Sequence, residues 1–351
     1  MIRFSYMKFG TLTFLFIIFG FNCLGQTGGG FSFPFLDLDY NARTASCGGH
    51  YLSYADEDVN QGIINPALLN DKMNKVVSVN QAFLSGGINF GMAAYAQKAL
   101  KGIVSTNVRY VDYGVFQRTE ANGQPSGTFR PFEYIVGVGY GKQINEVLSF
   151  GGNLNFIGSN LESYSAYGFS IDMGGMYKHP NNLFSTSFLV KNAGLKVKNY
   201  TTNDRGVLPI DFQIAASYKL AHAPFRFNVN INNLNRWDLT YNDPFAQPTY
   251  DALTGDTIPV PKANFIEKTA RHIVLATELL VSKNLTLRMG FNYHRRQEMK
   301  LVERPGLSGF CFGVGFNSKL VRVDYGFVMY SKAGYNNVIS LTSAISNWKK
   351  K

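Results

Sequence analysis

The chain has 351 residues, a formal net charge of +11 and 16% charged residues, while 15% of its residues are aromatic. Soluble globular domains usually carry about 25% charged residues, so this composition disfavours an ordinary soluble fold. The mean hydropathy of −0.08 excludes a bundle of apolar membrane helices. The positive charge fits an anionic membrane surface or an acidic partner, and nucleic acid is not expected as a partner of an exported protein.

Residues 1–25 have the pattern of a secretory signal peptide. Two basic residues precede the apolar block 10–21, and a small-residue cleavage point precedes Gln26. The block is shorter than the ~20 residues that cross a bilayer. Cys23 leaves a lipoprotein alternative open, although the residues before it do not resemble a lipobox. We therefore expect an exported chain.

Residues 26–75 show no regular period. A stretch of this length without periodicity is unusual in a compact domain unless it packs against something, and it is predicted to be an N-terminal hatch inside a barrel. Within it, Asn65, Pro66 and Ala67 form a hatch turn. Two interpretations stay open: a gate that responds to ligand, or a rigid turn in which Asn65 caps backbone groups and Pro66 fixes the chain.

From residue 76 onward, apolar and polar side chains alternate, which predicts strands because successive side chains point to opposite faces. In FRFNVNIN (225–232), one parity is apolar and the other is Arg and Asn. The strands are long and their Tyr residues gather near the ends, as in strands that cross a membrane. Fourteen strands are predicted, at 76–85, 88–97, 102–117, 130–143, 147–158, 166–178, 183–192, 208–220, 225–236, 269–281, 285–297, 307–317, 320–331 and 337–347.

The fold class that follows is all-β: a 14-stranded antiparallel transmembrane β-barrel over 76–347, closed because lipid tolerates no unpaired strand edge. The connections alternate between short and generally longer ones. Outer-membrane barrels place short turns in the periplasm and long loops outside, so both termini, with the basic tail 348–351, are expected in the periplasm. Outer-membrane lipids are then the partners of the outer face.

The opposite parity of these strands is polar and predicts a network inside the lumen. Its members are Arg226, Asn228, Asn230, His272, Arg288, Asn292, His294, Arg322 and Asp324. Gly137, Gly139 and Gly141 in GVGYG lie on the same parity. Because no helix follows, they do not match a dinucleotide fingerprint and are interpreted as room for a segment inside the barrel.

Loop 237–268 combines four prolines with aromatic residues and is a candidate partner-binding loop. Its aromatic anchors are Trp237, Tyr241, Phe245, Tyr250 and Phe265. A lid folded over the barrel mouth is an equally open interpretation. HRRQEMKLVER (294–304) is either a basic rim for acidic lipopolysaccharide or an acidic partner, or the solvated, charged base of a loop.

No catalytic constellation is found, and neither a metal site nor a cofactor is expected. The five histidines are scattered, without a nucleophile elbow or an HExxH helix. Cys47 and Cys311 have no metal-site spacing, and a disulfide between them is a possibility in an oxidising compartment.

The segment FSFPFLDLDYNARTASCGGHYLSYADEDVNQGIINPALLND resembles the hatch of the FadL-like outer-membrane barrels. Its lead-in from Phe33 to Gly49 is similar to the PorV/PorQ branch of the Bacteroidetes. LRMGFNYHRRQEMKL, GFCFGVGF and AGYNNVISL look like the PorQ members of that branch. Cys47 and the terminal NWKKK depart from the pattern.

The resemblance implies a non-enzymatic barrel subunit of the type IX protein secretion system. Such a subunit would anchor a PorZ-like surface protein beside the PorU/PorV attachment complex. The alternative is a FadL-like channel for the uptake of small hydrophobic compounds. A cargo shuttle similar to PorV is a third, weaker option.

Overall fold

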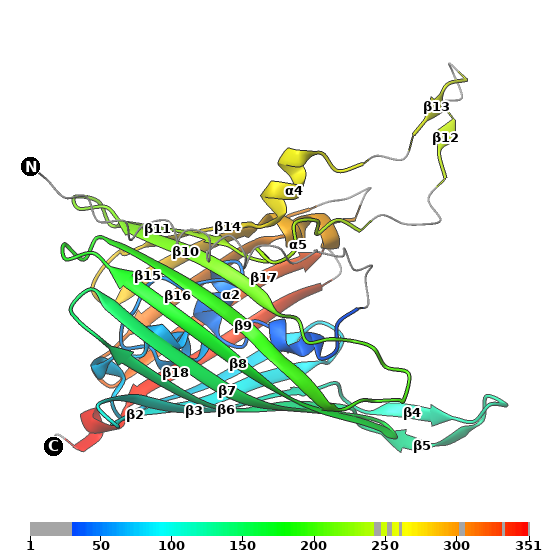
Figure 1. Ribbon diagram of the computed structural model, residues 1–351, viewed down its shortest axis with the longest axis horizontal. Helices are drawn as coiled ribbons and strands as arrows, with labels where there is room; N and C mark the ends of the chain where they lie inside the picture. The colour runs from blue at the N-terminus through cyan, green and yellow to red at the C-terminus, as the bar shows by residue number, and fades with distance from the viewer. Residues whose placement is uncertain are drawn as a thin grey trace, which may run out of the picture.

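The computed structural model describes residues 30–241, 247–250, 255–259, 262–301, 306–331 and 334–349, so the predicted signal peptide lies outside the described residues. Fourteen strands close into one barrel with antiparallel neighbours (Figure 1). None of the helices in the described part of the chain has the length and apolar character needed to span a membrane.

All fourteen predicted strands are present, and the predicted fold class is confirmed. The barrel strands are β1 (Val76–Leu84), β2 (Asn89–Ala99), β3 (Gly102–Asp112), β6 (Phe132–Gln143), β7 (Leu148–Leu161), β8 (Tyr164–Lys178), β9 (Phe184–Lys198), β10 (Asp211–Lys219), β11 (Phe225–Ile231), β14 (Ile273–Leu279), β15 (Leu285–Asn292), β16 (Phe310–Asn317), β17 (Val321–Ser331) and β18 (Gly334–Ala344).

The alternation in sequence becomes an outer and an inner face of the wall. On β11, the side chains of Phe225, Phe227 and Val229 are exposed on the outside, whereas Arg226 is only 5% exposed and Asn228 is buried. Strands with an apolar outer face and a polar inner face suit a barrel that is surrounded by hydrocarbon.

The two ends of the barrel differ. At one end, which we call the short-turn end, six turns of two to five residues connect the strands, and the C-terminus lies there (Figure 1). The other end, the long-loop end, carries a hairpin of β4 (Phe116–Thr119) and β5 (Pro125–Phe129). It also carries the loop between β11 and β14. This loop includes the short pair β12 (Thr249–Tyr250) and β13 (Thr257–Ile258).

Several predicted strand boundaries are wrong at the long-loop end. Residues predicted to begin one strand form helix α4 (Phe265–Arg271), and residues predicted to end another form α5 (Tyr293–Met299). Asparagine explains both changes: the side chains of Asn264 and Asn292 cap these helices by accepting hydrogen bonds from backbone N–H groups. Alternation continues across such a helix start and so conceals it.

Three other predicted strands also end early. The strand predicted at 102–117 ends at Asp112, because Phe116 belongs to the β4–β5 hairpin. The strand predicted at 225–236 ends at Ile231. The last strand ends at Ala344, where the 3-10 helix η4 (Ile345–Lys349) begins.

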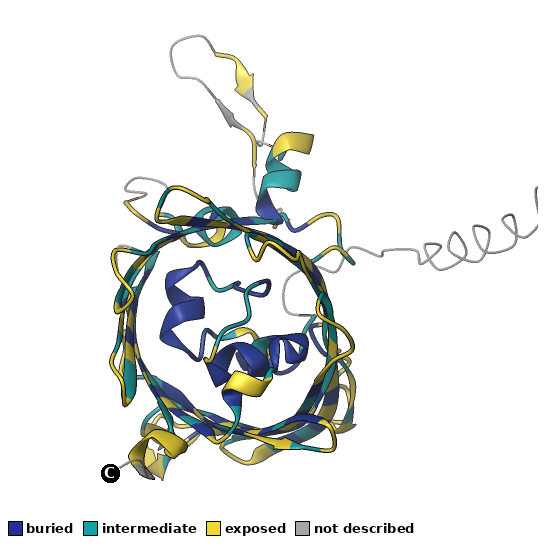
Figure 2. Cartoon of the chain, turned by 90° about the vertical axis from the view of Figure 1, so that its left-hand side faces the viewer, coloured by how far each residue is buried: buried dark blue, intermediate teal, exposed yellow. Residues whose placement is uncertain are grey.

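Residues 30–75, which we call the plug, lie inside the barrel (Figure 2). They form a chain of short helices rather than one regular element. These are η1 (Pro34–Asp37), α2 (Ala42–Ser46), α3 (Val59–Ile64), η2 (Pro66–Leu68) and η3 (Asp71–Met73). The side chains of Asn41, Asp58, Asn65 and Asn70 each cap the helix that follows. These Asn and Asp caps divide the segment into short helices, which explains why it shows no single period.

Wall glycines make room for the plug. A Cβ on Gly151 would lie 2.3 Å from the carbonyl oxygen of Pro66, and one on Gly174 would lie 2.1 Å from Asn65 Oδ1. Gly141 also faces the Pro66 carbonyl oxygen, as the interpretation of GVGYG expected. Gly137 instead faces the side chains of wall asparagines. At Gly141, Gly151 and Gly174 the plug thus approaches the wall more closely than a wall residue with a Cβ would allow.

Candidate functional site

A cluster of buried ion pairs joins the plug to the wall. Glu278 on β14 lies 3.3 Å from Arg43 of the plug, 2.6 Å from Arg226 on β11 and 3.0 Å from Arg288 on β15. The hydroxyl of Tyr51 in the plug donates a fourth hydrogen bond to this carboxylate. Glu278 is therefore shared by two plug residues and two wall arginines.

The cluster continues around the wall. Arg288 lies 2.6 Å from Asp324 on β17, which also pairs with Arg322 at 2.7 Å. Asp56 of the plug forms ion pairs with Arg43 at 2.6 Å and with Arg322 at 3.3 Å. Two of these ion pairs join the plug to the wall: Arg43 of the plug pairs with Glu278 on a strand, and Asp56 of the plug pairs with Arg322 on another. We call this cluster of seven charged residues the lock. Its members are Arg43, Asp56, Arg226, Glu278, Arg288, Arg322 and Asp324.

Four predicted lumen residues, Arg226, Arg288, Arg322 and Asp324, belong to the lock. The other predicted residues lie elsewhere. Asn292 donates to the carbonyl oxygen of Gly48, Asn230 reaches Gln213 at 3.5 Å, and Asn228 is buried in the wall. His272 bonds to the backbone oxygens of Asn232 and Trp237 at the base of the long loop, and His294 lies on α5.

Three charged residues of the lock were not predicted from the sequence: Arg43, Asp56 and Glu278. A signal for Glu278 was available, because it lies on the inner parity of β14 directly opposite Arg226 and Arg288 on the adjacent strands. Arg43 gave no such signal, since the plug has no period.

The predicted turn in the plug holds several backbone groups. Asn65 accepts a hydrogen bond from the N–H of Ala67 and donates one to the carbonyl oxygen of Leu52, while Pro66 begins η2. All three residues of the turn are buried. This geometry favours the rigid-turn interpretation over a gate.

The possible disulfide between Cys47 and Cys311 is not present, and both thiols are free and buried. Cys47 packs with Tyr51 and Ala276. The thiol of Cys311 instead accepts a hydrogen bond from Arg295 at 3.6 Å. The two thiols therefore have different neighbours.

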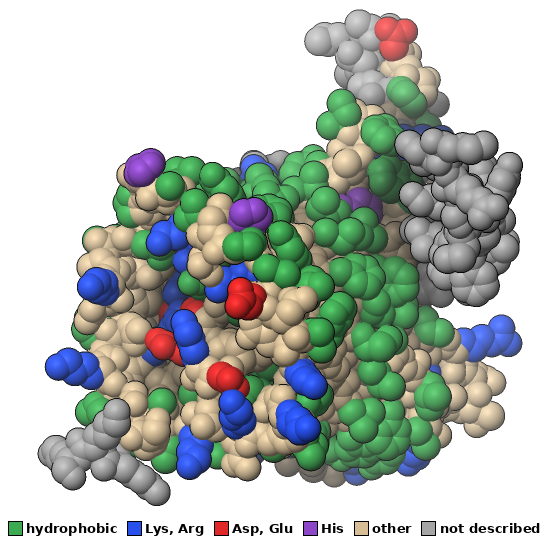
Figure 3. Space-filling model, turned by 60° about the vertical axis from the view of Figure 1, so that its left-hand side comes forward, with side chains coloured by type: hydrophobic (Ala, Val, Ile, Leu, Met, Phe, Trp, Pro, Cys, Tyr) green, Lys and Arg blue, Asp and Glu red, His purple; other side chains and the backbone are tan. Residues whose placement is uncertain are grey.

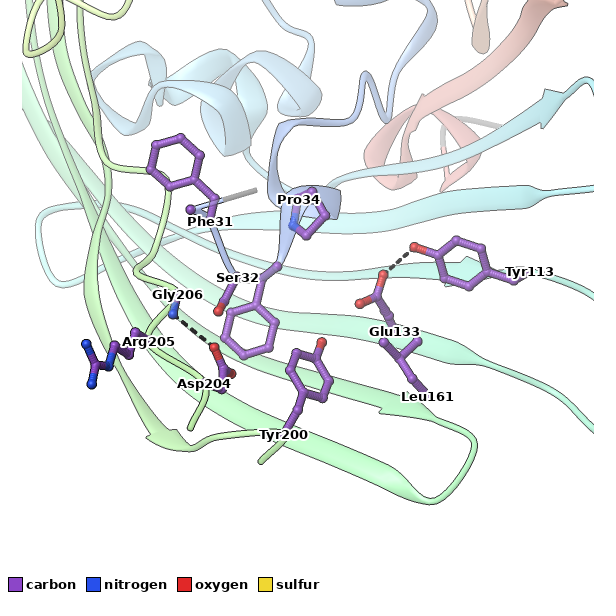
Figure 4. Close-up of a pocket in the computed structure, with 12 residues that line it drawn as sticks. Phe31, Ser32, Pro34, Tyr113, Glu133, Leu161, Tyr200, Asp204, Arg205 and Gly206 are labelled. Atoms are coloured by element: carbon purple, nitrogen blue, oxygen red, sulfur yellow. Dashed lines mark hydrogen bonds between the residues drawn. The ribbon is translucent and has the colours of Figure 1, made fainter. Parts of the chain in front are cut away.

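A pocket of about 670 Å³ opens at the long-loop end, between the start of the plug and the wall (Figure 4). We call it the mouth pocket. Its lining is mostly apolar and aromatic and includes Phe31, Pro34, Tyr113, Leu161 and Tyr200.

A hydrogen-bonded polar group adjoins this apolar lining. Tyr113 donates to the carboxylate of Glu133 (Figure 4). Ser159 donates to the same carboxylate, and Tyr200 donates to Ser159. Burial raises the pKa of Tyr200 to about 12. The mouth pocket was not predicted from the sequence, because residues 31, 113, 133 and 200 meet only in the tertiary structure.

The loop between β9 and β10 closes one side of the mouth pocket. Asp204 in this loop pairs with Lys196 on β9 at 2.8 Å. The hydrogen bond from Lys196 holds the pKa of Asp204 below its ordinary value. The loop is thus tied to the barrel by a pair that is largely shielded from solvent.

A second structure at the long-loop end projects away from the barrel (Figures 1 and 2). We call residues 237–272 the arm. Its base is a stack in which the Trp237 ring lies 5.5 Å from the rings of both Phe265 and His272. Lys268 and Asp238 add an ion pair at 2.6 Å.

The arm exposes apolar side chains to solvent. Phe265 is 70% exposed, Ile266 is 76% exposed and Tyr241 is 62% exposed. Of the other predicted anchors, Phe245 lies outside the described residues, and Tyr250 belongs to β12. The arm extends outward in both views rather than covering the mouth, which favours the partner-binding interpretation over the lid.

Two arginines of the basic segment predicted at 294–304 contact other parts of the protein. Arg295 pairs with Asp39 of the plug at 2.8 Å, and Arg296 donates to the carbonyl oxygens of Gly306 and Ser308. These two arginines fix the plug and the neighbouring loop.

No protein-family model and no curated protein matches the sequence. Among solved structures, the Pseudomonas putida toluene transporter TodX is similar with a TM-score of 0.55 and 13% identity, over 88% of this chain and 99% of that chain. The CymD monoaromatic hydrocarbon channel has a TM-score of 0.53 and 12% identity, over 88% and 98%.

The chain has the fold of the FadL-like outer-membrane barrels. The Ralstonia pickettii toluene transporter TbuX, at a TM-score of 0.50 and 11% identity, covers 88% of this chain and 99% of that one. These three proteins are named as transporters or channels. At these identities the likeness concerns the FadL-like fold alone, because one fold hosts many functions.

Proposed function

We propose that this FadL-like barrel is a non-enzymatic outer-membrane anchor whose arm holds a surface partner. The observation that carries the proposal is the arm, a projecting element with exposed Phe265, Ile266 and Tyr241 on a stacked aromatic base. Large apolar and aromatic side chains that project into solvent are typical anchors of protein interfaces.

The lock supports the same proposal from inside the barrel. Moving the plug would separate Arg43 from Glu278 and Asp56 from Arg322, and would leave buried charges unpaired, which typically costs about 3–5 kcal/mol. A barrel whose plug is held in this way suits a fixed scaffold better than a lumen that opens in each transport cycle.

The partner in this proposal comes from the resemblance to the PorQ members of the type IX secretion system. It would be a PorZ-like surface protein, beside the PorU/PorV attachment complex. The long-loop end would face the outside of the cell, with both termini in the periplasm. The C-terminus at the short-turn end and the arm at the opposite end are compatible with that orientation (Figure 1).

The test is capture of the partner from detergent-solubilised outer membranes with the full chain as bait. Replacing Phe265 and Ile266 by Ser should abolish capture of a PorZ-like protein. The matched control replaces Val115 and Phe116 by Ser, because these are exposed apolar residues at the same end but outside the arm. Equal capture by both variants would refute the role of the arm.

A second candidate function is a channel for small hydrophobic compounds, which the comparisons favour at the level of the fold. A specific observation supports it: the pairing of β9 with β10 ends at Lys191 and Asp211, and β9 continues to Lys198 with β8 as its only partner among the described strands. A cavity of about 290 Å³ lies behind this break, between plug and wall.

Uptake of radiolabelled toluene into proteoliposomes tests the channel. Uptake above that of empty vesicles, and its loss when a bulky maleimide is attached to an introduced Asp211→Cys, would support this function. If toluene enters no faster than in empty vesicles while partner capture persists, the anchor remains and the channel is refuted.

A further inference from the structure

Each of the six turns at the short-turn end carries a lysine at or beside the turn. In order around the barrel, these residues are Lys101, Lys142, Lys178, Lys219, Lys283 and Lys319. All except the half-buried Lys219 are exposed. Figure 3 turns this end forward and shows basic side chains spread over it, next to apolar ones. We call the six residues the lysine ring.

Every lysine of the ring lies close in sequence to an exposed apolar side chain. Leu100, which is 82% exposed, precedes Lys101, and Leu320 follows Lys319. The corresponding residues in the other four turns are Ile144, Phe184, Phe225 and Val281. An apolar group beside a long cationic side chain is the arrangement expected at the boundary between hydrocarbon and lipid headgroups.

The ring lysines also form no ion pairs with the part of the chain that the structure describes. Among the described residues, no carboxylate lies within ion-pair distance of any of the six. Four cations at the long-loop end do have such partners. These pairs are Arg118 with Glu162, Arg130 with Asp112, Lys196 with Asp204 and Lys268 with Asp238. The positive charge of the ring is therefore available to an external anion.

We propose that the lysine ring binds the headgroups of anionic phospholipids in the leaflet at the short-turn end. A protein partner would need a patch on one side of the rim, whereas the ring repeats in all six turns around the barrel, as a surrounding leaflet does. Each lysine near an anionic surface contributes favourable electrostatic energy that decreases with salt. The proposal requires only that the barrel lies in a bilayer and is independent of what the arm binds.

The experiment measures lipid preference by native mass spectrometry of the purified full chain in mixed micelles of phosphatidylglycerol and phosphatidylcholine. The unmodified chain should bind phosphatidylglycerol over phosphatidylcholine by at least about tenfold at low salt, and less at high salt. Changing all six ring lysines to Gln should remove this preference.

Two controls separate the ring from net charge and from folding. Changing Arg118, Arg130, Lys198, Arg205, Lys262 and Lys300 to Gln removes the same charge from the long-loop end and should leave the preference intact. Changing the six ring lysines to Arg should also retain it. The proposal is overturned if the six-Gln ring variant keeps the preference or if either control loses it. It is also overturned if polyglutamate binds tightly while the chain shows no lipid preference.

Discussion

Glu278 on strand β14 lies 3.3 Å from Arg43 of plug helix α2, although 235 residues separate them in the chain. Three arginines share this carboxylate, which lies at the boundary between plug and wall. The plug is therefore held by charge as well as by packing.

Glu278→Gln should destabilise the barrel. The change keeps the shape of the side chain but leaves Arg43 and Arg226 facing a neutral group, so we expect the free energy of unfolding to fall by about 3–5 kcal/mol. Urea unfolding in detergent, followed by tryptophan fluorescence, measures the loss. Glu120→Gln, at an exposed position in the β4–β5 hairpin, should change stability by less than about 0.5 kcal/mol. Equal effects would contradict the lock.

Two neighbouring glycines test the fit between plug and wall. Gly151→Ala places a Cβ 2.3 Å from the Pro66 carbonyl oxygen and should cost about 1–3 kcal/mol. Gly152→Ala meets only a backbone oxygen at 3.5 Å, which is an ordinary contact, and should be nearly neutral. The same unfolding measurement compares them. A neutral Gly151→Ala would show that the plug does not pack against β7.

The loop over the mouth pocket should loosen in acid. Because the pKa of Asp204 in the folded protein is held below its ordinary 3.8 by Lys196, its ion pair stabilises the closed loop above pH 3.8. This stabilisation is lost as the pH falls through the lowered value. A spin label on Asn203 should gain mobility as the pH falls below 3.8 and through the lowered pKa of Asp204, whereas one on Asn284 should not. With Asp204→Asn, the Asn203 label should be mobile at every pH.

Cys47 and Cys311 should be unreactive in the folded barrel. Both thiols are buried, and burial raises the pKa of the Cys47 thiol to about 12, which suppresses the reactive thiolate. Maleimide should therefore modify neither residue until the chain is unfolded, and both afterwards, as mass spectrometry of the peptides reports. A crosslinked peptide pair without added oxidant would contradict the free thiols.

The sequence by itself determined the wall. Period-two alternation, an apolar parity such as Phe225 and Phe227, and the alternation of short and long connections predicted fourteen closed strands, all of which are present. This succeeded because each strand side chain faces either the outside or the lumen, and that choice is recorded locally in the residue type.

Only the tertiary structure decided what the lumen and the mouth contain. The partner of Glu278, the contact of Gly151 with Pro66, and the convergence of Phe31, Glu133 and Tyr200 join residues that are distant in sequence. The plug has no period because short Asn-capped helices follow the shape of the wall rather than a repeat of their own. Its contacts are fixed by packing complementarity between distant segments, which no local pattern records.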